Sequence, residues 1–124
     1  MTKQTLLDLA AQCETATADQ RRELLVKGWE AVHGERPCLI GWDLGSWLTT
    51  FIPFSTMLDA KAYESAALMM VPEGGFGSLI EGVFPDGAVG FCAVVTLPTR
   101  AEGYAPTPAL AILAARLRAA AGEV

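Results

Sequence analysis

The sequence predicts an α+β fold in which a small antiparallel sheet packs between helices. Helical apolar periodicity occupies the first third of the chain and its C-terminal segment. Between them, residues 77–84 and 88–97 are rich in β-branched and aromatic residues and flank the turn sequence PDG, which predicts a β-hairpin. Because residues 88–97 are apolar on both strand faces, helices are expected to cover both faces, as in an α-β-α sandwich.

Length and composition favour one domain spanning residues 1–124. The chain has 124 residues, of which 52% are apolar, enough for one core but not for two. No run reaches the roughly 18 apolar residues of a membrane helix, and the N-terminal stretch carries Asp8 and Glu14. We therefore expect a cytoplasmic protein that does not enter a membrane.

Two helices are predicted before residue 34. The first covers about residues 4–15 and has one apolar face at the helical spacing, formed by Leu6, Leu9, Ala10 and Cys13. Thr17 and Gln20 have the spacing of a capping box and predict a second helix over about 18–33 that ends near Gly34. Its expected buried residues are Leu25, Trp29 and Val32.

Residues 35–54 contain two prolines and two glycines and match neither helical nor strand periodicity. Within them, the sequence CLIGW (38–42) is a candidate third strand. Thr56 and Asp59 have capping-box spacing and predict a helix over about 57–70, which Pro72 ends.

The C-terminal segment predicts a last helix after a polar loop over 100–104. Thr107 can cap its N-terminus, Pro108 suits its first position, and Gly122 follows its end. The residues expected to face inward are Leu110, Leu113, Ala114 and Leu117.

Charge and cysteine usage exclude several functions. The net charge is −5 and the nine basic residues form no cluster, whereas nucleic-acid binding needs a concentrated positive field. The three cysteines occur in no CxxC arrangement, so neither a disulfide framework nor a zinc site is predicted. We expect no nucleic-acid partner, no metal and no cofactor.

Catalytic chemistry has little support in the sequence. His33, the single histidine, falls at a predicted helix end, where a capping or surface role is favoured over a dyad with Cys38. The glycine-rich stretch PEGGFG (72–77) leads from a helix into a strand, the reverse of a phosphate-binding loop, and is interpreted as a turn. No catalytic residue is predicted, and the protein is not expected to be an enzyme.

Four stretches resemble the phage ABA sandwich domain family of small phage and prophage proteins. They are LLDLAAQCETATADQRRELLVKGWEAV (6–32), YESAALMMVPEGG (63–75), the hairpin, and TPALAILAARLRAAA (107–121). The resemblance implies an α-β-α sandwich and a phage or prophage setting, but no transferable activity. The sequence departs from the family pattern at Gly75, which separates VPEG from the aromatic Phe76.

The aromatic stretch GWDLGSWLTTFIPF (41–54) is the candidate interaction site. The residues predicted to contribute to a homodimer contact are Trp42, Trp47, Phe51 and Phe54. The alternative is a buried segment that anchors the core of one monomer. The function expected from these observations is a non-catalytic module that binds a host, defence or phage protein. A structural homo-oligomer or phage assembly factor is the alternative, and a small enzyme is the third.

Overall fold

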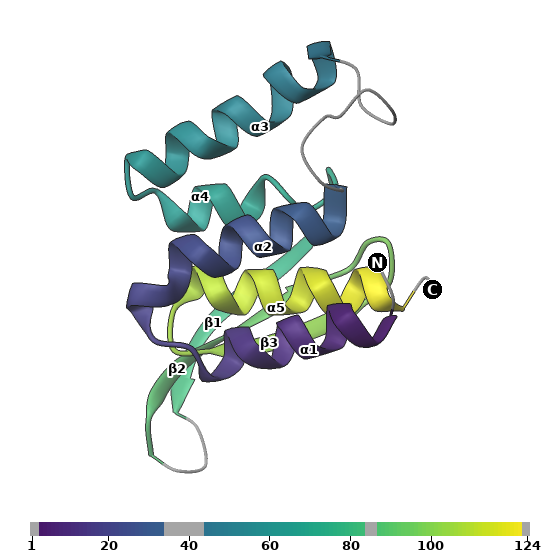
Figure 1. Cartoon of the computed structure of the whole chain (residues 1–124). Helices are drawn as coiled ribbons and strands as arrows, with labels where there is room; N and C mark the ends of the chain where they lie inside the picture. Colours follow the sequence, from purple (N-terminus) through teal and green to yellow (C-terminus); the bar gives the residue numbers. More distant parts are fainter. Residues whose placement is uncertain (1–2, 34–43, 84–86, 123–124) are drawn as a thin grey trace.

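The computed structural model describes residues 3–33, 44–83 and 87–122, with only the backbone described at residues 33 and 44–51. The elements, in chain order (Figure 1), are α1 (Lys3–Thr15), η1 (Ala18–Gln20), α2 (Arg21–His33), α3 (Leu44–Asp59), α4 (Tyr63–Leu68), β1 (Phe76–Val83), β2 (Val89–Val95), β3 (Ala101–Ala105) and α5 (Pro108–Ala121). The strands form one antiparallel sheet of order β1-β2-β3. Helices pack against this sheet, so the α+β class is confirmed.

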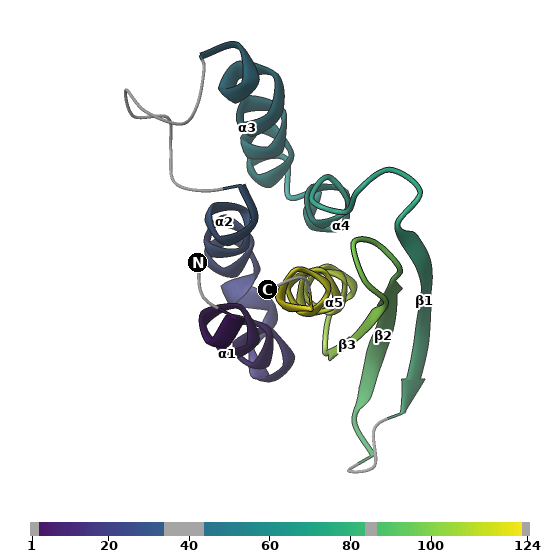
Figure 2. The same cartoon turned by 90° about the vertical axis from the view of Figure 1, so that its right-hand side faces the viewer.

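The layers follow the order sheet, α5, outer helices. In Figure 2 the sheet stands at one side of the molecule, α5 lies against it, and α1 and α2 lie beyond α5. The sequence analysis expected helices on both faces of the sheet, but all the described helices lie on one side of it. The difference arises because α5 is apolar around its whole circumference, so the second helical layer covers α5 and not the far face of the sheet.

Helix α5 is the centre of the core. Most of its residues are buried, and α1, α2, α4, β2 and β3 all contact it. Its N-terminus forms as the sequence predicts, with the Thr107 hydroxyl accepting the Leu110 N–H at 3.4 Å and Pro108 in the first turn. Helix α2 approaches α5 closely at Gly28, where an added Cβ would collide with the Leu113 side chain.

Helices α1 and α2 match their predicted ranges closely. The four residues expected on the apolar face of α1 are the ones that it buries. The Thr17 N–H donates to the Gln20 side chain at 3.0 Å, which is one half of the predicted capping box, and η1 leads directly into α2. Leu25 and Trp29 are buried as expected, whereas Val32 is half-buried.

The predicted helix over 57–70 is wrong. Thr56 lies inside α3, where its hydroxyl donates to the Ile52 carbonyl at 2.9 Å and caps nothing. The chain breaks at Lys61, which has a positive φ of 60°, and the short helix α4 follows. Helix α3 also continues through Pro53, which the sequence analysis treated as part of an irregular segment.

The hairpin is confirmed, but the third strand is β3. A polar loop was expected over 100–104, where the structure has β3 (Ala101–Ala105). The candidate strand 38–42 falls outside the described residues. β3 lacks a β-branched residue because α5 lies almost in contact with its backbone. A Cβ on Gly103 would collide with the Ala111 carbonyl and lie 2.9 Å from the Ala114 Cβ.

Candidate functional site

The candidate site is the face of the sheet turned away from α5, called the outer face below. Side chains alternate between the two faces of a strand, and Gly103 faces α5, so the even-numbered residues of each strand point outward from Ser78 onward. Two rows cross the three strands on this side: Ile80, Cys92 and Tyr104 form one, and Ser78, Val94 and Glu102 form the other. Gly82 and Gly90 lie opposite each other beside the first row.

The centre of the outer face is apolar and accessible. Ile80 is 61% exposed and Tyr104 is 44% exposed, while Cys92 and Val94 are half-buried between them. Because Gly82 and Gly90 have no side chains, a shallow hollow of about 120 Å³ opens near Ile80, Cys92 and Tyr104. An aromatic ring beside a hollow with an apolar floor is typical of surfaces that bind other proteins.

A polar strip on β3 borders this apolar centre. The Tyr104 hydroxyl donates to the Glu102 carboxylate at 2.7 Å, and Arg100 forms an ion pair with the same carboxylate at 3.2 Å. Hydrogen bonding to Glu102, with further contributions from Cys92, raises the pKa of Tyr104 to about 12. The Tyr104 hydrogen bond is the main cause that lowers the pKa of Glu102; desolvation opposes the shift, and the charge of Arg100 and its hydrogen bond support it. At neutral pH the strip therefore presents a protonated phenol beside an ionised carboxylate.

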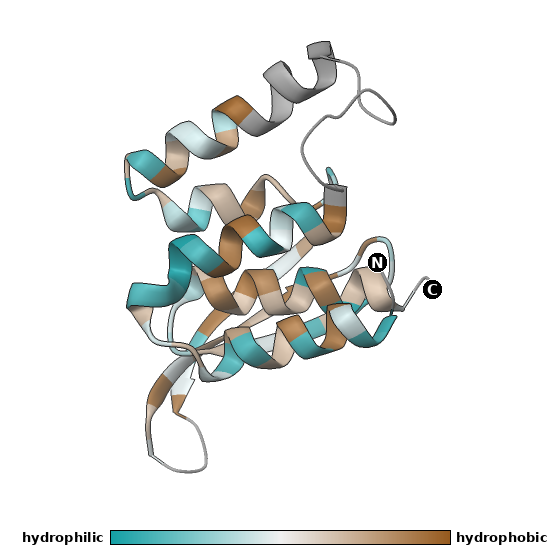
Figure 3. Cartoon of the chain, in the orientation of Figure 1, coloured by the Kyte–Doolittle hydropathy of each residue, from teal (hydrophilic) through white to brown (hydrophobic). Residues whose placement is uncertain are grey.

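The hairpin extends past the helices and exposes apolar side chains at its end. Val83 and Val89, which face each other across the two strands, are 70% and 58% exposed. These strand ends, on either side of the grey loop, have apolar colouring in Figure 3. They lie on the helix side of the sheet, but α5 does not reach them.

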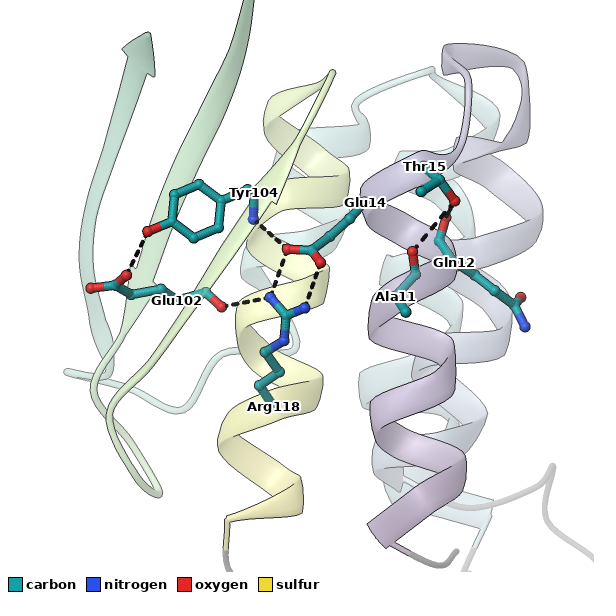
Figure 4. Close-up of polar contacts among 7 residues, drawn as sticks. All are labelled: Ala11, Gln12, Glu14, Thr15, Glu102, Tyr104 and Arg118. Atoms are coloured by element: carbon teal, nitrogen blue, oxygen red, sulfur yellow. Dashed lines mark hydrogen bonds and ion pairs between the residues drawn. The ribbon is translucent and has the colours of Figure 1, made fainter. Parts of the chain in front are cut away.

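A half-buried polar cluster holds β3 against α1 and α5, as Figure 4 shows. The Glu14 carboxylate at the end of α1 accepts the Tyr104 backbone N–H at 3.0 Å and the Arg118 guanidinium at 2.7 Å. Arg118 also donates to the Glu102 carbonyl at 3.0 Å. Desolvation would raise the pKa of Glu14, but the hydrogen bonds from Arg118 and from the Tyr104 N–H outweigh it and lower that pKa. The hydrogen bonds of the Glu14 carboxylate and the Arg118 guanidinium are made to other parts of the fold, which indicates that the cluster has a structural role.

Among the described residues, two further hollows lie between helices. One, of about 400 Å³, is open to solvent between α1 and α2 and includes Asp8, Lys27 and Glu30 in its wall. The other, of about 260 Å³, surrounds Arg21 and Tyr63, whose guanidinium and ring stack with 4.3 Å to the ring centroid. Neither combines an apolar floor with converging polar groups in the way that ligand pockets do.

Of the four predicted interface residues, the structure describes the side chain of Phe54 alone. Phe54 is fully buried and its ring stacks on Trp29 with centroids 4.4 Å apart, so Phe54 has the core-anchoring role that was the alternative. Trp47 and Phe51 lie on α3, where only the backbone is described, and Trp42 is outside the described residues. A dimer contact through Trp42, Trp47 and Phe51 stays a prediction.

The residues considered for catalysis do not form a described site. α2 ends at His33, as the sequence predicts, but the side chain of His33 and all of Cys38 are outside the description. Burial raises the pKa of the Cys13 thiol to about 12, so Cys13 is a core residue, as expected. Cys92 lies half-buried on the outer face, which the sequence analysis expected a helix to cover.

The described part of the chain contains neither a metal-binding cluster nor a membrane-spanning helix. No group of three or more histidine, cysteine, aspartate or glutamate side chains among the described residues is arranged to hold a metal ion. Within the same residues, no helix has the length and apolar character needed to cross a membrane.

The sequence analysis missed the outer face because its rows depend on β3. Ile80 and Tyr104 are 24 positions apart, and only the pairing of both with Cys92 brings them into one row. Comparison with known proteins adds no further assignment: no family model, curated protein or solved structure matches this chain.

Proposed function

We propose that the protein is a non-catalytic module that binds another protein through the outer face of its sheet. The observation that supports this proposal is the exposed row of Ile80, Cys92 and Tyr104, which no described helix covers. Apolar side chains of this size on an open sheet face mark surfaces that contact a partner.

The arrangement around the row supports a protein partner in preference to a small molecule. The hollow beside Ile80 holds about 120 Å³, well below the roughly 300 to 1,000 Å³ of typical ligand pockets. A flat apolar centre with the polar strip of Arg100 and Glu102 at its border has the organisation of a protein interface. The resemblance to phage ABA sandwich proteins suggests that the partner is a host or phage protein.

The test is a quantitative pull-down from host cell lysate with a matched pair of variants. Tyr104→Lys places a charge in the outer face, while Leu68→Lys places the same charge on α4 at a residue of similar exposure, 40% against 44%. We expect Leu68→Lys to retain the proteins that the wild type captures and Tyr104→Lys to lose them, since a lysine at the centre of an apolar contact is disfavoured.

Circular dichroism of both variants controls for folding. Equal capture by the two folded variants would exclude the outer face as the binding surface. Loss of capture with Leu68→Lys alone would place the surface on the helical side of the molecule.

A further inference from the structure

The two edges of the sheet differ in accessibility. The β3 edge is closed by α1, because the Glu14 carboxylate accepts the outward N–H of Tyr104 at 3.0 Å. At the opposite edge, no described residue outside β2 hydrogen-bonds the backbone of β1. Within the described part of the chain, β1 (Phe76–Val83) therefore has an open edge, where the N–H and C=O groups directed away from β2 are placed to pair with another strand.

We propose that two copies of this chain pair through their β1 edges, antiparallel, with Ile80 of one copy opposite Ile80 of the other. The result is a two-fold dimer with a continuous six-stranded sheet. Pairing stops at two copies because each chain offers one open edge. Two open edges would permit head-to-tail growth into a filament. This proposal concerns the strand edge and does not depend on what the outer face binds.

Symmetry restricts the register. Residues opposite each other in an antiparallel ladder point to the same face, and a two-fold axis perpendicular to the sheet keeps every residue on its own face. One residue must therefore lie opposite its own copy. The register of β1 with β2 is regular from Ser78 onward, with a bulge between Phe76 and Ser78. An axis at Ile80 places Ser78 opposite Gly82 and uses this regular part alone.

Charge supports the same register. Glu81 is the single charged residue of β1, and an axis at Ile80 places it opposite Leu79. An axis at Glu81 would bring two carboxylates face to face, which is destabilising. An axis at Leu79 would bring Glu81 opposite Gly77, within the bulged part of the strand.

Pairing at Ile80 joins the apolar rows of the two outer faces. The side chain of Ile80, now 61% exposed, would contact its copy, so that the row from Tyr104 through Cys92 to Ile80 continues across the axis. The five residues of the regular part, from Ser78 to Gly82, give a paired length of roughly 17 Å at about 3.4 Å each. A strand contact this short buries much less than the area of about 800 Å² per partner in a standard interface. We therefore expect a weak dimer, with a Kd between about 1 μM and 1 mM.

The test compares Ile80→Lys with Val89→Lys by sedimentation velocity up to about 1 mM, the upper end of the expected Kd range. Both residues are apolar, β-branched and well exposed, at 61% and 58%, but Val89 lies on the central strand. The wild type and Val89→Lys should rise above the monomer mass of 13.1 kDa with concentration, and Ile80→Lys should not. A wild type that stays monomeric at the highest concentration, or two variants that dimerise equally, would overturn the proposal.

Hydrogen exchange separates edge pairing from other modes of self-association without relying on a variant. The outward amides of β1 should exchange more slowly as the wild-type concentration rises, because their N–H groups enter the new ladder. Dimerisation that leaves β1 exchange unchanged would exclude the β1 edge. A monomeric protein that still captures partners through Tyr104 would leave the proposed binding function standing and exclude the dimer alone.

Discussion

Glu14 and Arg118, 104 positions apart in the chain, form a two-pronged ion pair that fastens the end of α1 to α5. The same carboxylate accepts the Tyr104 N–H, so one side chain holds two helices and the edge of the sheet together. Both side chains are largely shielded from solvent, with Glu14 23% exposed and Arg118 30% exposed. A charge pair with several hydrogen bonds in such a setting is costly to break on one side.

We expect Glu14→Gln to lower the free energy of unfolding at pH 7 by about 1–3 kcal/mol, since it leaves Arg118 without its counter-charge. The effect should depend on pH. Because folding lowers the pKa of Glu14, its stabilisation is complete above the unfolded value near pH 4.5 and is lost as the pH falls through the folded value. Urea unfolding between pH 3 and pH 7 should therefore show a flatter pH dependence for Glu14→Gln.

Glu23→Gln is the matched control for that experiment. Glu23 forms an exposed pair with Lys27 on one helix at 3.0 Å, and such pairs contribute about 0.5 kcal/mol or less. If the two variants lose equal stability, the half-buried cluster of Glu14 and Arg118 does not have the structural role described here.

We expect Gly103→Ala to destabilise the protein by about 1–3 kcal/mol through overpacking. The added Cβ would meet the Ala111 carbonyl and the Ala114 Cβ, so α5 would have to move away from β3. Gly82→Ala is the control, because a Cβ on Gly82 meets no atom within 4 Å. Thermal unfolding of both variants measures the difference, and equal melting temperatures would contradict the close contact of α5 with the sheet.

We expect Phe54→Ala to lower stability by about 3–5 kcal/mol, the usual cost of a large cavity in a core. Phe54 is fully buried and stacked on Trp29, and it links α3 to α2. Ile52→Ala, two residues earlier on α3 and exposed, should cost less than about 1 kcal/mol. Urea unfolding with both variants is the measurement. A loss of stability below about 1 kcal/mol for Phe54→Ala would contradict its role in the core and favour the predicted role in a dimer interface.

Glu102→Gln should shift the ionisation of Tyr104 to lower pH. The Tyr104 phenol donates to the Glu102 carboxylate, and this bond is the main reason that its pKa rises to about 12. Ultraviolet titration in a Tyr63→Phe background follows Tyr104 alone, since the chain has two tyrosines. The variant should ionise nearer the ordinary value of about 10. An unchanged titration, with circular dichroism confirming the fold, would mean that the bond does not form in solution.

Local sequence patterns predicted the elements that are determined by residues close together in the chain. The apolar repeat of α1, the hairpin and the Thr107–Pro108 start of α5 each depend on residues close together in the chain. The strand β3 could not be predicted in this way. Its Gly103 reflects the nearness of α5, and that contact forms only in the folded chain.

The candidate site was missed for a related reason. Residues 88–97 are apolar on both strand faces, and this pattern predicted that both faces are covered. It could not show that one face packs against α5 while the other is left open by the described helices. The sequence of α5 indicates where the other helices pack. A helix that is apolar on all sides must be covered on all sides, so α1 and α2 pack on α5 and not on the far face of the sheet.

The position of α5 in the chain also affects how the protein can be made. Every described element from α1 to β3 is synthesised before residues 108–121, yet α1, α2, α4 and the sheet all rest on that helix. A nascent chain therefore holds several apolar faces without a partner until residues 108–121 leave the ribosome. Synthesis should be the stage at which this protein depends most on chaperones, and early release by a premature stop codon should yield a chain that proteases remove.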